Sequence, residues 1–140
     1  MFKSIIVPVD TREPSSWAKA LPAAISLAKA NGALLTVATV IPNVKAMVQA
    51  EWSVIAFQDM VDTARAQLGS IIGEFPEAAD ATTEVGSGSI WRGIIEIAKR
   101  AEADLIVLAS HRPAMKDYLI GANAVNVVRH APCSVMVVRD

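Results

Sequence analysis

Residues 5–10 read IIVPVD, a run of β-branched side chains that ends in a proline and an aspartate. An uninterrupted apolar run of this length predicts a strand buried on both faces, as in a parallel sheet. Pro8 has no N–H group and is therefore expected near the end of the strand. Residues 14–30 follow with the apolar spacing of a helix, in which Ser15 or Ser16 is a candidate cap and Pro22 is expected to introduce a kink.

The alternation of strand and helix continues along the rest of the chain. Further strands are predicted at Leu34–Ile41, 82–85, 104–110 and Ser134–Arg139, and further helices at 50–75, about 90–101 and 121–130. This order, βαβαβαβαβ, calls for right-handed crossovers and a parallel sheet with helices on both faces. No shift in composition and no linker divides the chain, so we predict one α/β domain over residues 1–140.

Composition excludes several other classes of protein. The chain has 140 residues, of which 53% are hydrophobic and 19% charged, unlike a disordered chain. A net charge of −1 argues against binding to nucleic acid, and the single cysteine, Cys133, cannot form an intrachain disulfide. No run approaches the ~20 apolar residues of a membrane span, and the start does not resemble a signal peptide. We therefore expect a cytoplasmic protein without membrane insertion.

Ligands of open parallel sheets bind outside the carboxyl ends of the strands, which makes the residues there the candidates for a site. They are Pro8, Val9 and Asp10 after the first strand, Val40 (with the two residues that follow it) after the second, Ala109, Ser110, His111 and Arg112 after the fourth, and Gly121, Ala122 and Asn123 at the start of the last helix.

The residue types in this set suit a mononucleotide. A helix N-terminus presents free N–H groups to a phosphate, which Gly121 would let approach closely and Asn123 could bind. Arg112 offers a planar cation beside that helix start. Asp10 could accept hydrogen bonds from a ribose, and backbone atoms near Val40 could recognise the edge of a base.

Each of these residues also has a simpler interpretation. Gly121 could be only a turn glycine, Asp10 could brace its own loop, and Arg112 could be solvated. His111 and His130 have the features of surface or hydrogen-bonded histidines rather than catalytic bases, and no metal-ligand spacing accompanies them. The chain contains no phosphate-binding G-x-x-x-x-G-K-[ST] motif, no dinucleotide glycine fingerprint after the first strand and no G-x-S-x-G motif.

Three segments together resemble the universal stress proteins, across essentially the whole chain. They are residues 5–10 (IIVPVD), 103–111 (ADLIVLASH) and 129–139 (RHAPCSVMVVR). The resemblance implies a sheet order of 3-2-1-4-5 with the site between strands 1 and 4. It also implies a homodimer that pairs through the last strand, Ser134–Arg139, with further pairing into tetramers left open. An edge that carries no lysine from residue 135 to 138 is consistent with such pairing.

Many members of this family bind ATP through the pattern G-x-x-G, nine residues, then G-[ST]. Ala109 and Arg112 stand at the two glycine positions here, and Ala122 replaces the hydroxyl residue. Ser110-His111-Arg112-Pro113, followed by Tyr118-Leu119-Ile120-Gly121 and Asn123, instead resembles a branch with the pattern S-H-R-P…Y-L-L-G-S-N, which includes nucleotide-binding members. Loss of one neutral hydrogen bond at Ala122 would weaken binding by up to about tenfold.

The resemblance therefore implies a nucleotide-binding stress or regulatory protein that holds ATP, or AMP or ADP, with the involvement of Mg²⁺ left open. No obvious general base or metal pair is present for fast hydrolysis, so we expect binding rather than enzymatic turnover. Two alternatives remain. One is a dimerisation module that needs no nucleotide, and the other is slow ATP hydrolysis or self-phosphorylation at Ser110 or His111.

Overall fold

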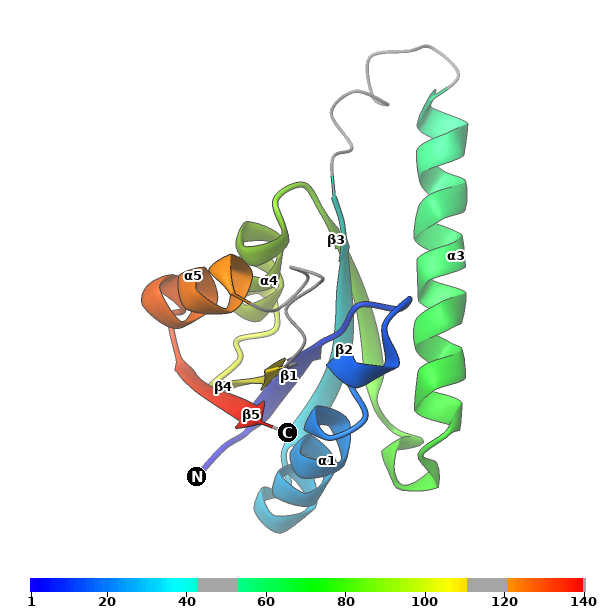
Figure 1. Cartoon of the computed structure of the whole chain (residues 1–140). Coiled ribbons are helices and arrows are strands. Elements are labelled where there is room, and N and C mark those ends of the chain that lie inside the picture. Colours follow the sequence, from blue (N-terminus) through cyan, green and yellow to red (C-terminus); the bar gives the residue numbers. More distant parts are fainter. Residues whose placement is uncertain (43–52, 111–120, 140) are drawn as a thin grey trace.

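The computed structural model of the chain describes residues 1–42, 53–110 and 121–139. Five parallel strands form one sheet in the order β3-β2-β1-β4-β5 (Figure 1). The strands are β1 (Ser4–Pro8), β2 (Leu34–Ile41), β3 (Thr82–Ser87), β4 (Leu105–Ser110) and β5 (Ser134–Arg139). The predicted α/β fold and strand order are confirmed.

Helices cover both faces of this sheet (Figure 1). They are α1 (Ala20–Asn31), α3 (Ser53–Gly73), α4 (Ile90–Arg100) and α5 (Ala122–His130), with short 3-10 turns η1 (Pro14–Ser16) and η2 (Pro76–Ala78). Helices α1 and α3 pack on one face, and α4 and α5 pack on the other. Among the described residues, no helix is both long and apolar enough to cross a membrane.

The central strands are apolar throughout because both of their faces are covered. In β1 and the residue after it, Ile5, Val7 and Val9 join the core under α1 and α3, whereas Ile6 joins the core under α4 and α5. All four side chains are fully buried. The same alternation in β4 explains why neither strand shows the polar alternation of a half-exposed sheet.

The predicted helix at 14–30 is wrong in its first third. Residues 14–16 form the separate turn η1, and α1 begins only at Ala20, with Lys19 as its N-cap. Neither serine caps a helix through its side chain. Pro22 is the third residue of α1, where a backbone N–H has no partner within the helix, so its ring removes no hydrogen bond there. Gly32 caps the C-terminal end of α1 with a φ of 63°.

The remaining boundaries differ by a few residues. Strand β3 continues to Ser87, two residues beyond the predicted end at residue 85. Ser89 stands at the N-cap of α4 but makes no capping hydrogen bond through its side chain. Gly121 is the N-cap of α5 rather than its first residue. The long helix predicted at 50–75 ends at Gly73, and the start of that prediction lies outside the described residues.

Candidate functional site

The pairing of β1 with β4 stops early. These two strands pair at Ile5↔Leu105 and Ile6↔Ile106, whereas the β1–β2 pairing continues to Pro8↔Ala38 and the β4–β5 pairing to Ser110↔Arg139. The carboxyl ends of β1 and β4 are therefore not paired with each other. This gap, which we call the β1–β4 fork, lies where the strand order reverses, and such a switch point is the usual ligand site of an open parallel sheet.

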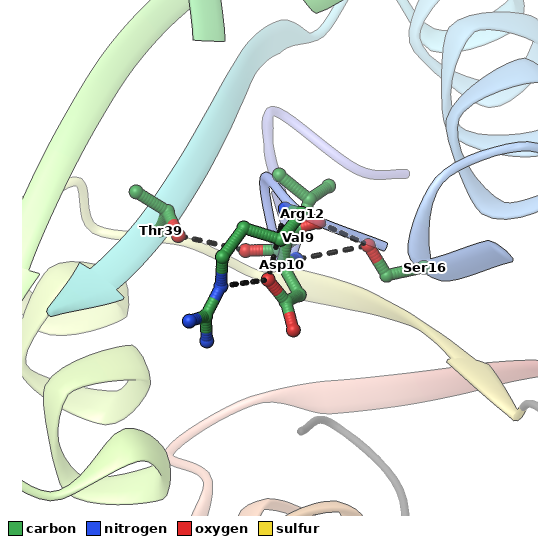
Figure 2. Close-up of polar contacts among 5 residues, drawn as sticks. All are labelled: Val9, Asp10, Arg12, Ser16 and Thr39. Carbon is green, nitrogen blue, oxygen red and sulfur yellow. Dashed lines mark hydrogen bonds and ion pairs between the residues drawn. The ribbon is translucent and has the colours of Figure 1, made fainter. Parts of the chain in front are cut away.

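Asp10 follows β1 at this fork and is 7% exposed. Its backbone N–H donates to Ser16 Oγ at 2.8 Å, and the Ser16 hydroxyl donates to the Asp10 carbonyl at 3.1 Å (Figure 2). The preceding carbonyl, of Val9, accepts a hydrogen bond of 2.8 Å from Thr39 Oγ1. Both neighbours thus hold the main chain at Asp10 from opposite sides.

The Asp10 carboxylate also braces its own loop, as the simpler interpretation proposed. Its Oδ1 accepts the Arg12 backbone N–H at 3.0 Å, and Arg12 Nε lies 3.6 Å from the same oxygen. The Arg12 side chain is 77% exposed, against 9% for the Asp10 side chain. Both contacts use Oδ1, so Oδ2 is left available for a ligand hydroxyl as far as the described residues show. Arg12 is not among the residues predicted for the site.

A cavity of about 420 Å³ opens beside Asp10, between the ends of β1 and β2 and the helix α3. This volume is within the usual range for small-molecule sites. The lining consists of Asp10, Thr11, Arg12, Thr39, Val40, Ile41, Pro42, Asp59, Met60, Thr63, Ala64 and Gln67. Of the residues predicted for the site, Asp10 and Val40, with the two residues that follow Val40, belong to this lining.

The α3 residues of the lining were missed. Asp59, Thr63 and Gln67 recur every four residues and thus share one face of the helix, which the sequence does reveal. The sequence cannot reveal which strand ends that face approaches. This contact depends on the crossover from β2 to β3 and on the tilt of a 21-residue helix.

The other predicted residues fall at the ends of β1 and β4 and at the start of α5. Pro8 ends β1 and Val9 follows it, both buried. Ala109 is buried and Ser110 is half-buried at the end of β4. The residues predicted to follow, His111 and Arg112, lie outside the described residues.

The start of α5 has a backbone conformation that favours glycine, and a Cβ built there would meet nothing within 4 Å. Gly121 adopts a φ of 59°, a conformation that glycine reaches without steric cost. Ala122 is exposed and Asn123 is half-buried in the first turn. Because α5 connects two parallel strands, it runs against them and begins at the carboxyl edge of the sheet, the same edge that carries Asp10.

Other reactive side chains lie elsewhere. His130 is exposed at the end of α5 and stacks on Trp91 with ring centroids 4.8 Å apart. Burial, and secondly the negative charge of Asp104, raises the pKa of the Cys133 thiol, which makes it a poor nucleophile at neutral pH. In the described part of the chain, no three His, Cys, Asp or Glu side chains gather as a metal site.

Comparison with known proteins finds relatives of similar length. The profile of the Universal stress protein family matches residues 1–139. Universal stress protein G of Salmonella typhimurium is 32% identical over 143 aligned positions, which cover 99% of this chain and 100% of that protein.

Solved structures share the fold. A universal stress protein in complex with cAMP aligns with a TM-score of 0.64 and 21% identity, covering 99% of this chain and 97% of that one. A universal stress protein family member from Arabidopsis thaliana with AMP bound aligns with a TM-score of 0.63 and 18% identity, covering 98% and 91%. At these identities the likeness shows the fold, and the two nucleotides are findings about those proteins.

Proposed function

Since the chain belongs to the universal stress protein family, we propose that it is a regulatory protein of the stress response that binds an adenine nucleotide: ATP, AMP or ADP. The observation that carries the proposal is the β1–β4 fork with the buried carboxylate of Asp10 beside it and the adjoining cavity of about 420 Å³. The relatives that hold cAMP and AMP support the same ligand class.

The proposed arrangement assigns each part of the nucleotide to one feature of the carboxyl edge. The base enters the cavity beside Val40 and α3, and the ribose hydroxyls reach Asp10. The phosphates extend toward the start of α5, where Gly121 permits close approach and the first N–H groups of the helix face an anion. Ser110, His111 and Arg112 are proposed as further phosphate contacts, on the strength of their place in the sequence at and after the end of β4.

We further propose that residues 1–140 form a single domain. We also propose that this domain belongs to the branch of the family with the pattern S-H-R-P…Y-L-L-G-S-N. The sequence of Ser110 to Pro113, and of residues 118–121, supports this assignment. In that branch an arginine stands where other members have the second glycine. Ala122 offers no hydroxyl, so phosphate binding would depend more strongly on backbone N–H groups.

The proposed activity is binding rather than rapid turnover. Slow hydrolysis or self-phosphorylation at Ser110 or His111 is the competing proposal, motivated only by their position after β4. Prolonged incubation with γ-labelled ATP separates the two. Released phosphate or labelled protein that disappears in a Ser110→Ala or His111→Ala variant would favour the enzymatic proposal.

Thermal unfolding with and without about 5 mM ATP, in Mg²⁺ and again in EDTA, tests the binding proposal. A Kd near 50 μM would add about 2.7 kcal/mol to the free energy of unfolding. For a chain of this length the expected rise in Tm is several degrees. No rise with ATP, ADP or AMP, together with no saturable binding at millimolar nucleotide, would contradict the proposal.

Asp10→Asn tests the site itself. A hydrogen bond to a charged group contributes about 1.5–3 kcal/mol, so we expect the Kd to rise by roughly ten- to a hundredfold. Asp80→Asn is the matched control, because Asp80 is exposed and precedes β3 at the opposite, amino edge of the sheet. Equal affinities for the two variants would exclude Asp10 from the site.

We also propose that two copies of the chain pair through β5. This strand ends the sheet, and its Val137 is 39% exposed beside Val125 and Val128 of α5, which are 57% and 55% exposed. These three valines border one apolar groove. An unprotected edge with an apolar border suits pairing with an identical edge.

A further inference from the structure

Helix α4 approaches β2 so closely at Gly93 that only glycine, which has no side chain, fits at this position. A Cβ atom built on Gly93 would lie 2.7 Å from Val40 Cγ1 and 2.8 Å from Val40 Cγ2. Carbon atoms pack at about 3.5–4.0 Å, so no side chain fits between the helix and the strand. The backbone of Gly93 does not have a positive φ. Close approach, rather than conformational freedom, is therefore what this glycine provides.

Val40 cannot yield to such a contact by rotating. Its side chain is branched at Cβ, which makes χ1 stiff, and the residue is 3% exposed. It pairs in register with Gly86 of β3, and a Cβ on that glycine would lie 3.5 Å from Val40 Cγ2. That contact is an ordinary one, and the tighter contact of such a Cβ is with Ile97 Cδ1, at 3.1 Å. The notch that holds the Val40 side chain is therefore formed by Gly93 of the helix.

The same residue borders the cavity from the other side. The Val40 side chain belongs to the core under α4, with Ile94 and Ile97. Its neighbours Thr39 and Ile41 line the cavity together with Val40. Because successive side chains of a strand point to opposite faces, a push on the Val40 side chain from α4 moves the strand end toward the cavity.

We infer that Gly93 is a positioning residue for the nucleotide site: it lets the Val40 side chain sink toward α4 and so sets the depth of the cavity at the end of β2. Gly93 contacts the back of the strand and does not line the cavity itself. This inference rests on the proposed function, because the ligand of the cavity is the adenine nucleotide proposed above.

The test compares two glycine-to-alanine substitutions in helices. In Gly93→Ala the new methyl group would displace Val40, and we expect ATP to bind roughly tenfold more weakly by calorimetry. In Gly69→Ala the new methyl group meets nothing within 4 Å, so it adds a helix-favouring residue without a contact. We expect Gly69→Ala to bind ATP as the unaltered chain does.

A rescue experiment separates positioning from general loss of stability. Val40→Ala removes the two methyl groups that the new Cβ would strike. In the Val40→Ala background, Gly93→Ala is therefore expected to leave the ATP affinity unchanged. The comparison is between the affinity of the double variant and that of Val40→Ala alone. If Gly93→Ala fails to fold, Val40→Ile serves instead, because it presses an added carbon into the same notch from the strand.

The outcomes are distinct. If the unaltered chain binds ATP and Gly93→Ala lowers Tm but leaves the ATP affinity unchanged, the inference is wrong and the proposed function stands. An affinity loss of the same size in the Val40→Ala background also overturns it. If the unaltered chain binds none of ATP, ADP and AMP, the proposed function fails first, and the inference fails with it.

Discussion

Asp104 shows how one carboxylate can join strands that lie a hundred residues apart in sequence. The backbone N–H of Lys3 donates to Asp104 Oδ2 at 2.8 Å, and that of Ser4 donates to Oδ1 at 3.0 Å. These hydrogen bonds lower the pKa of Asp104 below its usual 3.8, and the one from Ser4 has the larger effect. Asp104, from the family-like segment 103–111, thus joins the amino ends of β1 and β4, opposite the carboxyl edge of the sheet that carries Asp10.

Asp104→Asn is expected to lower the free energy of unfolding at neutral pH. A depressed carboxylate pKa contributes stability above the unfolded-state value, and this contribution is lost as the pH falls through the lower folded-state value. The difference between Asp104→Asn and the unaltered chain should therefore shrink below pH 3.8. Urea unfolding from neutral to acid pH measures it, with Glu96→Gln on the exposed face of α4 as the control. A constant difference across the acid range would contradict the assignment.

At the scale of elements, the connection between β1 and α1 is what departs from the sequence pattern. The apolar spacing of residues 14–30 favours one helix, yet the first three residues form η1 and the helix starts at Ala20. Ser16 explains the difference, because its hydroxyl is committed to the main chain of Asp10 through two hydrogen bonds. A tertiary contact here overrides the helical propensity of the segment and places Asp10 at the fork.

Two serine substitutions in η1 test that role. Ser16→Ala leaves the buried Asp10 backbone N–H without its partner, whereas the Asp10 carbonyl keeps the Glu13 N–H at 2.9 Å. We therefore expect a loss of about 1–3 kcal/mol of unfolding free energy and weaker ATP binding. Ser15→Ala removes a buried hydroxyl that has no hydrogen-bond partner in the described structure, so we expect no loss or a slight gain. Urea midpoints and ATP titration provide both readouts. Equal stability of the two variants would refute the role of Ser16.

At the scale of the whole molecule, the two edge strands of the sheet differ in exposure, because β3 is mostly half-buried and β5 is mostly exposed. Helix α3 packs along β2 and β3, whereas β5 lies at the other end of the sheet with Met136 and Val137 partly exposed. The cavity proposed to bind the nucleotide and the apolar groove beside β5 have no lining residue in common. Dimerisation and nucleotide binding can therefore be tested separately.

Val137→Lys is expected to convert dimers to monomers, because it places a charge in the apolar groove beside Val125 and Val128. Light scattering should show a mass near 14.9 kDa instead of twice that value. Leu34→Lys is the control, since Leu34 is 73% exposed at the amino end of β2. An unaltered chain that is monomeric at micromolar concentration would contradict the dimer proposal. Dimers unaffected by ATP, in a chain that does not bind it, would favour the nucleotide-independent module.

The buried strands, their alternation with helices and the class of sheet could be predicted from the sequence alone, because the length and continuity of apolar runs report burial along the chain. The sequence also placed Asp10 and Val40 at strand ends. The strand order came from family resemblance, since local patterns do not say which strands are neighbours. The approach of α3 to the cavity, the use of Ser16 and the Gly93 notch were decided only by tertiary structure. Each is a contact between elements, and its geometry depends on packing that no local pattern encodes.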